Sequence, residues 1–270
     1  MSPLLSFVTT CKGRLGHLSE TLPALVAQAN TETIVVDYDC PDGAAGWVKQ
    51  HFPNVKVVRV GNAPFFNVAS ARNRGAEAAA SPWLCFVDAD TRVHTEFSQV
   101  VQPLLDPRRY FQCGHGRREL MGSIMVSRQA FETIGGYDDV IEGWGGEDRD
   151  LSRRLGFAGI QAAELPVHLL ETIPHAAELR TRFHQIRDIG AGWVINRMYL
   201  EAKHGMMMLS RAELSREIRT QIYAGVRQEV LAAQAEQRDP CFTVSEGWRP
   251  FVANQEVERL MTIRMRPRQS

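Results

Sequence analysis

Residues 83–90 read WLCFVDAD, an apolar run of five residues that ends directly in two carboxylates. A short, continuous apolar run is typical of a strand that is buried on both faces of a sheet. Upstream, residues 33–37 read TIVVD and end in the same way. Two such runs, each followed by acidic residues, indicate strands of a parallel sheet whose carboxyl ends lie at one edge. Ligands of open parallel sheets bind at that edge.

The same alternation continues along the chain and predicts the fold class. Apolar runs predict further strands and amphipathic stretches predict helices, at residues 4–10, 18–28, 55–60, 67–80, 123–127, 147–155 and 161–170. Strands that alternate with helices form a mostly parallel sheet with helices on both faces. We therefore expect an α/β, Rossmann-like sheet flanked by helices. Mainly helical sequence follows from about residue 176 and predicts a C-terminal extension.

The composition restricts the class of ligand and the cell compartment. Lys and Arg together number 31, as do Asp and Glu. This balance argues against a nucleic-acid-binding protein, which usually carries a basic excess, so a nucleotide is expected here only as a small ligand. Five cysteines without a CxxC pair favour a reducing compartment. No apolar run reaches the ~18 residues of a membrane-spanning helix, so we expect a cytoplasmic protein.

The two carboxylates that follow residues 83–87 suit a metal ion. Asp88 and Asp90 are two positions apart, so both side chains can point the same way at the end of the strand. Carboxylate oxygens bind a hard divalent cation, which in turn neutralises the charge of a departing diphosphate. An Asp-x-Asp triplet alone is more often a solvated turn. The second acidic strand end, with Asp37 and Asp39, favours the metal site.

A predicted helix with basic residues precedes this strand. Arg72 and Arg74 lie in the sequence SARNRG at residues 70–75. The guanidinium of Arg72 can reach a phosphate or fix an aspartate of the site. Arg74 is explained as well by the solvated face of an amphipathic helix.

The sequence WGGED supplies residues suited to a second substrate. Trp144 offers a flat apolar surface to the face of a sugar ring, and Gly145 and Gly146 let the backbone approach a ligand closely. Glu147 and Asp148 then begin a predicted helix. The helix dipole favours one acidic residue there without explaining the whole motif. A carboxylate at this point can take a proton from an acceptor hydroxyl.

A histidine can complete the set of metal ligands. His168 lies in LPVHLL, near the edge of the sheet at which ligands bind, and His175 follows soon after. Imidazole binds the same divalent metals as carboxylate oxygens do. We predict His168 as the further ligand, with His175 as the alternative.

In their order along the chain these motifs resemble those of GT-A fold glycosyltransferases, especially family 2. The motifs that carry the resemblance are TTCKGR at residues 9–14, DYDCPD at 37–42, ARNRG at 71–75, DAD at 88–90 and GWGGED at 143–148. Tyr38 and Asp39 depart from the commoner Asp-Gly, which leaves open whether Asp37 or Asp39 recognises the base. GWGGED is similar to the acceptor-side motif of β-1,4-galactosyltransferases and bacterial chondroitin-type polymerases. The resemblance covers about residues 4–175.

The resemblance implies a role for each matched residue. The residues that would bind the nucleotide are Thr9, Arg14, Asp37 or Asp39, Arg72 and Asp88. The residues that would hold Mn²⁺ or Mg²⁺ are Asp90, His168 and Asp88. The sugar or acceptor would contact Trp144, Gly145 and Gly146. The catalytic residues would be Glu147 and Asp148, with Asp148 as the general base.

The function implied is a metal-dependent, inverting glycosyltransferase of polysaccharide biosynthesis. It would move a hexosyl or N-acetylhexosaminyl group from a UDP-sugar to a hydroxyl of a saccharide or glycolipid. The expected divisions are a GT-A catalytic domain at residues 1–200, with a nucleotide-binding half at about 1–92 and an acceptor-binding half at 93–200, and a helical C-terminal extension at 201–270. Its basic end makes the extension a candidate for contact with the inner face of a membrane or for a homodimer, although a solvated basic terminus is the more common explanation; the arginines are Arg249, Arg259, Arg264, Arg266 and Arg268.

Two other functions remain open from the sequence. A nucleotidyltransferase that forms sugar nucleotides would share the sheet and the metal, and would release pyrophosphate. The loop after the first strand, with Lys12, Gly13, Arg14 and Gly16, matches the glycine-rich basic loop of such enzymes only in part. A non-catalytic module that binds a sugar nucleotide is the second alternative. A dinucleotide dehydrogenase is disfavoured because no GxGxxG follows the first strand.

Overall fold

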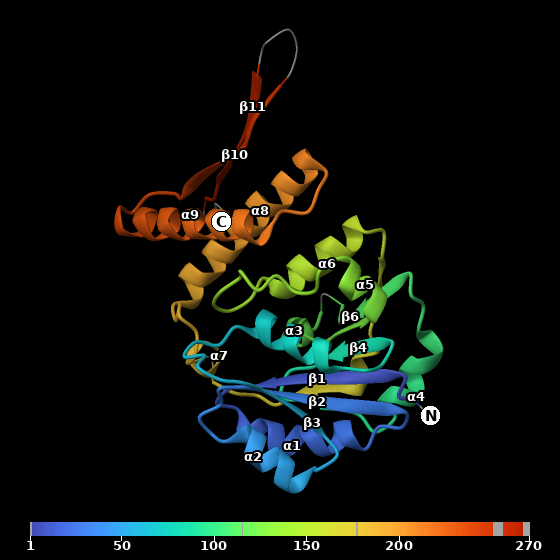
Figure 1. Cartoon of the computed structure of the whole chain (residues 1–270). Helices are drawn as coiled ribbons and strands as arrows, with labels where there is room; N and C mark the ends of the chain where they lie inside the picture. Colours follow the sequence, from blue (N-terminus) through green and yellow to red (C-terminus); the bar gives the residue numbers. More distant parts are fainter. Residues whose placement is uncertain (1, 115, 177, 251–255, 267–270) are drawn as a thin grey trace. The chain divides into compact units, whose positions relative to one another are not determined.

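The computed structural model describes residues 2–114, 116–176, 178–250 and 256–266. The chain forms two compact units. We call them the sheet unit, Met1–Asp139 with Glu147–Gln185, and the helical unit, Val140–Gly146 with Ile186–Ser270. Figure 1 follows the chain by colour from one end to the other. Because residues 140–146 belong to the helical unit, the chain leaves the sheet unit and returns to it before α6 (Glu147–Phe157) begins.

The sheet unit contains a seven-stranded sheet with the strand order β3-β2-β1-β4-β7-β6-β8. Its strands are β1 (Leu5–Cys11), β2 (Thr31–Tyr38), β3 (Lys56–Val60), β4 (Trp83–Phe86), β6 (Arg109–Gln112), β7 (Ile124–Ser127) and β8 (Gln161–Glu164). In the described part of this sheet only β7 runs antiparallel to its neighbours, β4 and β6. The other pairings are parallel. The predicted mostly parallel α/β sheet is confirmed.

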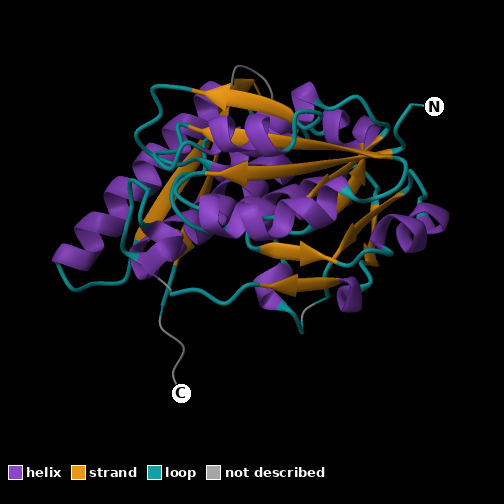
Figure 2. Cartoon of the chain, turned by 90° about the horizontal axis from the view of Figure 1, so that it is seen from below, coloured by secondary structure: helices purple, strands orange, loops and turns teal. Residues whose placement is uncertain are grey.

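Helices cover both faces of this sheet, as the alternation of strands and helices predicts. The other helices of the sheet unit are α1 (Leu15–Val26), α2 (Ala44–His51), α3 (Val68–Ala78), α4 (Phe97–Val101), α5 (Arg128–Thr133) and α7 (Glu178–Thr181), with short 3₁₀ turns η1 (Gln102–Leu104), η2 (Arg118–Leu120) and η3 (Val167–Leu169). Side chains of α3, α5 and α6 share one buried cluster, whereas those of α1 and α2 pack in another. Figure 1 shows α1 and α2 on one side of β1 and β2 and α3 on the other, and Figure 2 shows the sheet from below with helices in front of the strands.

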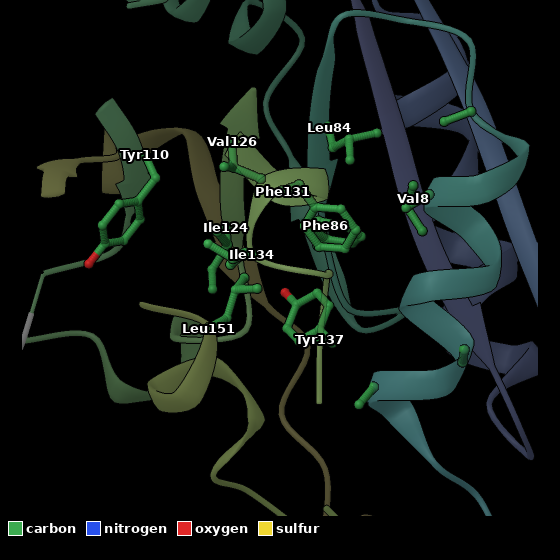
Figure 3. Close-up of a cluster of buried hydrophobic side chains, with 14 of the residues drawn as sticks. Val8, Leu84, Phe86, Tyr110, Ile124, Val126, Phe131, Ile134, Tyr137 and Leu151 are labelled. Atoms are coloured by element: carbon green, nitrogen blue, oxygen red, sulfur yellow. The ribbon is translucent and has the colours of Figure 1, made fainter. Parts of the chain in front are cut away.

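Aromatic rings fill the centre of the cluster on the α3 side. The ring centroid of Phe86 lies 5.2 Å from that of Phe131 and 5.1 Å from that of Tyr137. Figure 3 shows these rings beside Val8 and Ile124, which come from β1 and β7. Ring contacts of this kind add to the free energy gained by apolar burial. This cluster makes the sheet a rigid support for the residues at the ends of its strands.

Helix α3 begins with a cap and lies unusually close to β1. The Asn67 side chain accepts a hydrogen bond from the backbone N–H of Ser70 at 2.8 Å, which satisfies one of the free donors at the start of the helix. A Cβ at Gly75 would lie 2.3 Å from Cγ1 of Val8, so only glycine allows this approach. The close packing fixes the face of α3 on which Arg72 is buried.

A short antiparallel pair lies beside the end of β4. Strand β5 (Thr91–Val93) pairs with β9 (Leu170–Thr172). Beyond the pair, the backbone N–H of Ile173 donates to the carbonyl oxygen of Asp90 at 2.8 Å. This pairing determines which residue after β9 comes close to Asp90.

The helical unit has its own buried core. Helices α8 (Ile189–Ser210) and α9 (Arg216–Ala235) pack with Tyr199 and Tyr223 in edge-on contact, 5.1 Å between ring centroids. Val140 and Ile141 are buried in the same cluster. In the part of the chain that the structure describes, no helix is long and apolar enough to cross a membrane.

The C-terminal extension differs from the expected one. The boundary predicted at residue 200 falls inside α8, and the helical unit begins at Ile186. After α9 the chain forms an antiparallel hairpin, β10 (Cys241–Pro250) and β11 (Glu256–Arg264), where the sequence predicted only helix and unpatterned chain. Met261 and Ile263 of β11 pack against the helical core. The last predicted basic residue, Arg268, lies outside the described residues.

Candidate active site

Polar residues gather where three parallel strands of the sheet unit end. Lys12 and Arg14 follow β1, Asp39 follows β2, and Asp88 and Asp90 follow β4. Neighbouring parallel strands end at the same edge of a sheet, which is where ligands of such folds bind. The predicted grouping of the acidic strand ends therefore follows from the pairing of β1 with β2 and with β4.

Arg72 joins residues from the two predicted halves of the site. Its side chain is buried, with an exposed fraction of 3%. Nη2 donates to Oδ1 of Asp88 at 2.8 Å, and Nη1 donates to Oδ1 of Asp148 at 2.6 Å and to Oε1 of Glu147 at 3.3 Å. Nη2 also lies 3.3 Å from the carbonyl oxygen of Gly122. Of the two contacts predicted for Arg72, the structure shows the one with acidic side chains.

Three carboxylates around one guanidinium leave an excess of negative charge. Burial, the neighbouring Glu147 and, more weakly, Asp88 raise the pKa of Asp148 well above its usual range, while the guanidinium of Arg72 opposes the rise. A general base works best when its pKa lies near the working pH. The surroundings of Asp148 therefore hold its pKa well above that of an ordinary aspartate.

Asp90 lies between a histidine and an arginine. Oδ2 of Asp90 is 2.7 Å from Nε2 of His175 and 3.2 Å from Nη1 of Arg14. Nη2 of Arg14 donates to the carbonyl oxygen of Leu179 at 3.2 Å, which orients the guanidinium. Arg14 and Asp90, both predicted site residues, are thus brought together, and His175 joins them.

The hydrogen bonds of His175 test whether this site fits a cation. Nδ1 lies 3.0 Å from the carbonyl oxygen of Ala176, which can only accept, so Nδ1 carries a proton. The 2.7 Å separation of Nε2 from Oδ2 of Asp90 is that of a direct hydrogen bond, and it is too short for an ion to lie between the two atoms. A carboxylate oxygen and an imidazole nitrogen are both ligands for Mn²⁺, so the pair fits such an ion. Among the described residues, no group of three or more His, Cys, Asp or Glu side chains forms a complete metal site.

His168 is not brought to Asp90. It lies in η3 with an exposed side chain, on the far side of β9 from Ile173, the residue that bonds to the backbone of Asp90. The strand between them places His168 roughly 10 Å or more farther along. Of the two histidines, the structure therefore brings His175, the alternative, to Asp90. The antiparallel pairing of β5 with β9, which decides this, is not visible in the sequence.

The two aspartates at the end of β2, Asp37 and Asp39, lie in different surroundings. Oδ1 of Asp37 accepts from the backbone N–H of Cys40 at 2.8 Å, and Oδ2 accepts from that of Ala45 at 2.7 Å. Asp37 is buried, and both of its carboxylate oxygens accept hydrogen bonds from the turn that leads into α2, whereas the side chain of Asp39 is 46% exposed. Thr9 is fully buried, and its hydroxyl has no hydrogen-bond partner among the described residues. Of these three predicted nucleotide contacts, only Asp39 presents a polar group to solvent.

Lys12 ties the ends of β1 and β2 together, a role that the sequence did not indicate. Nζ donates to the carbonyl oxygens of Tyr38, Asp39 and Ala63, at 3.1, 2.9 and 2.7 Å. Lys12 is buried, so its charge is stabilised by these carbonyl groups. The three carbonyls use all three ammonium donors.

The loop before α6 has a backbone that depends on glycine. Gly143, Gly145 and Gly146 have φ of +77°, +82° and +107°, a region in which other residues are strained. Trp144 lies between them with 36% of its surface exposed. The predicted acceptor residues thus form a tight turn in the helical unit, and the chain runs on directly into Glu147.

A comparison with protein families identifies the family to which the chain belongs. The model of glycosyl transferase family 2 matches residues 6–157, more than half of the chain. The match includes the strand ends, Arg72 and the start of α6. No curated protein sequence matches the chain significantly.

Solved structures with the same fold are glycosyltransferases of low sequence identity. The mannosyltransferase PcManGT from Pyrobaculum calidifontis, in complex with GDP-Man and Mn²⁺, is 17% identical with a TM-score of 0.56, over 87% of this chain and 76% of that one. S. aureus TarS 1–349 in complex with UDP is 15% identical with a TM-score of 0.57, over 86% and 72%. The catalytic domain of Drosophila β1,4-galactosyltransferase 7 with xylobiose is 14% identical with a TM-score of 0.52, over 72% and 79%. At these identities the likeness establishes the GT-A fold.

Proposed function

The chain belongs to glycosyl transferase family 2, and from this we propose that it transfers a sugar from a UDP-sugar to a hydroxyl of a saccharide or glycolipid acceptor. The transfer inverts the configuration at the anomeric carbon and uses Asp148 as the general base. The observation that carries the proposal is the set of contacts made by Arg72. It holds Asp88, at the end of a nucleotide-side strand, within hydrogen-bond distance of the same guanidinium that binds Asp148.

The donor side is supported by the exposed carboxylate after β2. Asp39 is the exposed member of the two candidates, and a carboxylate there can accept from the N–H groups of a base. Uracil and guanine both offer such donors. The solved relatives bind UDP in one case and GDP-Man in another. We favour UDP from the motif resemblance, and the experiment below includes GDP-mannose.

Asp90 and His175 would hold the divalent cation, with Asp88 nearby in the same loop. When bound, Mn²⁺ or Mg²⁺ supplies positive charge that stabilises the departing diphosphate. Arg14, at 3.2 Å from Asp90, adds a fixed positive charge beside that carboxylate. This group of residues would therefore bind and orient the phosphates.

The transfer itself needs one base and no covalent intermediate. Asp148 accepts the proton of the acceptor hydroxyl as that oxygen attacks the anomeric carbon. The bond from the anomeric carbon to the phosphate oxygen breaks, and UDP leaves with the electron pair. Positive charge develops on the sugar in the transition state. The excess negative charge of Asp88, Glu147 and Asp148 over Arg72 stabilises it. The ring of Trp144, in the loop before α6, would pack against the face of the acceptor's sugar ring.

The experiment that tests the proposal is nucleotide release from a panel of UDP-sugars and GDP-mannose. Each donor is tested with Mn²⁺, Mg²⁺ or EDTA, and Asp90→Ala is the comparison variant. We expect one donor to release its nucleoside diphosphate slowly in the presence of metal, and the release to be lost with EDTA and in Asp90→Ala. His168→Ala serves as the matched control, since His168 lies away from Asp90 and its loss should leave the release unchanged.

Other outcomes would point elsewhere. Release of pyrophosphate from a nucleoside triphosphate and a sugar phosphate would indicate a nucleotidyltransferase instead. No release from any donor, together with metal-dependent UDP binding in calorimetry, would indicate a module that binds sugar nucleotides without transfer. Loss of release in His168→Ala but not in His175→Ala would overturn the metal ligands named here.

A further inference from the structure

The loop that precedes α6 is bonded to two side chains from helices of the same unit. Asn196 lies in α8 and Tyr223 in α9, and both are buried. Nδ2 of Asn196 donates to the carbonyl oxygens of Glu142 at 3.0 Å and Gly145 at 2.6 Å. These two bonds span the loop from one end to the other, with Trp144 between them.

The hydroxyl of Tyr223 completes the arrangement. It accepts a hydrogen bond from the backbone N–H of Glu142 at 3.1 Å. Its own proton faces Oδ1 of Asn196 at 2.9 Å and the carbonyl oxygen of Glu142 at 3.0 Å. Both donors and the acceptor of the Asn196 amide are therefore used, and the orientation of the amide follows from its bonds to two carbonyls.

Packing adds to the hydrogen bonds. A Cβ at Gly146 would lie 3.2 Å from Cβ of Asn196, so the backbone of the loop already touches this side chain. Three glycines with positive φ are flexible in the absence of outside contacts, because glycine has the largest conformational freedom of any residue. Asn196 and Tyr223 supply such contacts at Glu142, Gly145 and Gly146. Arg227 adds an ion pair to the side chain of Glu142 at 3.2 Å, but both side chains are about one-third exposed, so the pair contributes little.

We propose that Asn196 and Tyr223 are positioning residues for the acceptor. They hold residues 142–146 in one conformation, and thereby fix the position of Trp144. Within the helical unit, this loop would contribute to acceptor binding. The inference rests on the proposed function for the meaning of the loop, but its structural part can be tested without turnover.

The first experiment measures amide hydrogen exchange of the peptide that covers residues 142–146 in the full chain. Tyr223→Phe removes one hydroxyl and keeps the ring in its contact with Tyr199. Asn196→Asp keeps an acceptor for Tyr223 but loses both bonds to carbonyls. We expect exchange in this peptide to be about five- to tenfold faster in each variant, since each loses buried hydrogen bonds worth about 1 kcal/mol. Exchange elsewhere in α8 and α9 should stay within about twofold of that of the wild type.

Thr220→Val is the matched control. It removes a hydroxyl from the same helix, but Oγ1 of Thr220 is exposed and bonds only to the carbonyl oxygen of Arg216 in the preceding turn. Its exchange profile over residues 142–146 should equal that of the wild type. Unchanged exchange in both Tyr223→Phe and Asn196→Asp would overturn the proposal.

The second experiment separates acceptor from donor. In Tyr223→Phe, KM for the acceptor should rise about five- to tenfold, while donor hydrolysis without acceptor and the Kd of UDP change less than about twofold. Equal losses in donor hydrolysis and in transfer would show a general structural role and overturn the assignment. If the wild type releases no nucleotide from any donor, the proposed function fails. The exchange result still decides whether Asn196 and Tyr223 hold residues 142–146 in one conformation.

Discussion

Arg72 is the residue at which the predicted halves of the site meet. One buried guanidinium faces three carboxylates, so the group as a whole is negative when all are ionised. Burial and the neighbouring carboxylates of Glu147 and Asp88 raise the pKa of Asp148, and the guanidinium opposes the rise. The same negative charge that raises the pKa of Asp148 also destabilises the folded state when Asp148 is ionised, which gives two opposite predictions for one substitution.

Asp148→Asn should abolish transfer and stabilise the protein. Loss of a general base lowers kcat by about 10²- to 10⁴-fold, while the Kd of UDP stays near that of the wild type. The raised pKa means that folded-state stability is fully present at low pH and decreases as pH rises through that pKa. Removing the ionisable group should therefore raise the melting temperature at pH 8, by roughly 2–4 °C per kcal/mol, and less at pH 4. Activity assays and thermal melts at both pH values measure this.

The pH dependence of transfer gives a separate check on Asp148. Because burial and Glu147 raise its pKa, the ionised base is lost at a higher pH than for an ordinary aspartate. We expect kcat to fall on the acid side from a midpoint well above the usual range near 4. A profile that stays flat down to pH 4.5 in the wild type would contradict this. Residual activity of Asp148→Asn should not depend on pH in this window.

Cys40 should be the most reactive thiol of the described residues. Sγ of Cys40 lies 3.7 Å from Sγ of Cys11, and the backbone N–H of Gly13 also bonds to it at 3.2 Å. The hydrogen bond from Cys11 is the largest cause that lowers the pKa of Cys40 to about 6. By contrast, burial raises the pKa of Cys113 to about 11. At pH 7 we expect iodoacetamide to modify Cys40 at least about 100-fold faster than Cys113, because only the thiolate reacts and far more of Cys40 is ionised. Peptide mass spectrometry over time gives both rates, and modification of Cys113 first would refute the assignment.

At the scale of single residues, the sequence predicted side chains that lie at strand ends and missed those fixed by pairing. Asp88, Asp90 and Asp148 were found because each follows an apolar run or opens a helix. His175 could be preferred to His168 only after β9 was seen to pair with β5. No pattern in the sequence near Asn196 or Tyr223 indicates their role, because each bonds to backbone atoms more than 25 residues away along the chain.

Among the elements, α3 depends most on close packing. A Cβ at Gly75 would lie 2.3 Å from Cγ1 of Val8 and 3.0 Å from Cγ2 of Val36. Gly75→Ala should lower the free energy of unfolding by about 1–3 kcal/mol, because it overpacks the space between α3 and the sheet. It should also weaken donor and acceptor functions together, since Arg72 lies on the same helix. Urea denaturation measures the change in stability.

Gly46→Ala is the control for Gly75→Ala. Gly46 also lies within a helix, α2, but a Cβ there has nothing within 4 Å. The substitution should raise the free energy of unfolding by about 0.5–1 kcal/mol, because alanine loses less conformational entropy in a helix. If both variants shifted stability in the same direction, the close approach of α3 to β1 would not be the cause.

Helices and strands could be predicted from the sequence where burial makes apolar residues recur at a regular spacing. Strands β1, β2, β4 and β7 are apolar runs, and α3 and α6 have an apolar face, so their positions were predicted to within a few residues. Strands β5 and β9 have three residues each, too few for a pattern. In β11, Met261 and Ile263 alternate with exposed Thr262 and Arg264, but charged residues before them hid the alternation. The hairpin was therefore predicted as unpatterned chain.

For the whole molecule, the division into units does not follow the order of the chain. Val140 and Ile141 are buried with α8 and α9, although they come before α6 of the sheet unit. A chain that ends at Gln185 would leave both side chains without their core. We expect this truncated chain to melt at a lower temperature and to bind a hydrophobic dye, with fast exchange at residues 140–146. A melting temperature equal to that of the full chain would show that the sheet unit folds independently of that core.

The loop at residues 142–146 is synthesised well before the residues that hold it, and this affects the order in which the parts of the chain can fold. Glu142 bonds to Tyr223, 81 positions later. At 5–20 residues per second, a ribosome needs about 4–16 s to add that length, and longer before the segment leaves the exit tunnel. The nascent chain can therefore complete the strands of the sheet before Glu142 to Gly146 have the partners that hold them. If the loop acts as proposed, the ability to bind the donor arises during translation, and the ability to use an acceptor arises only near its end.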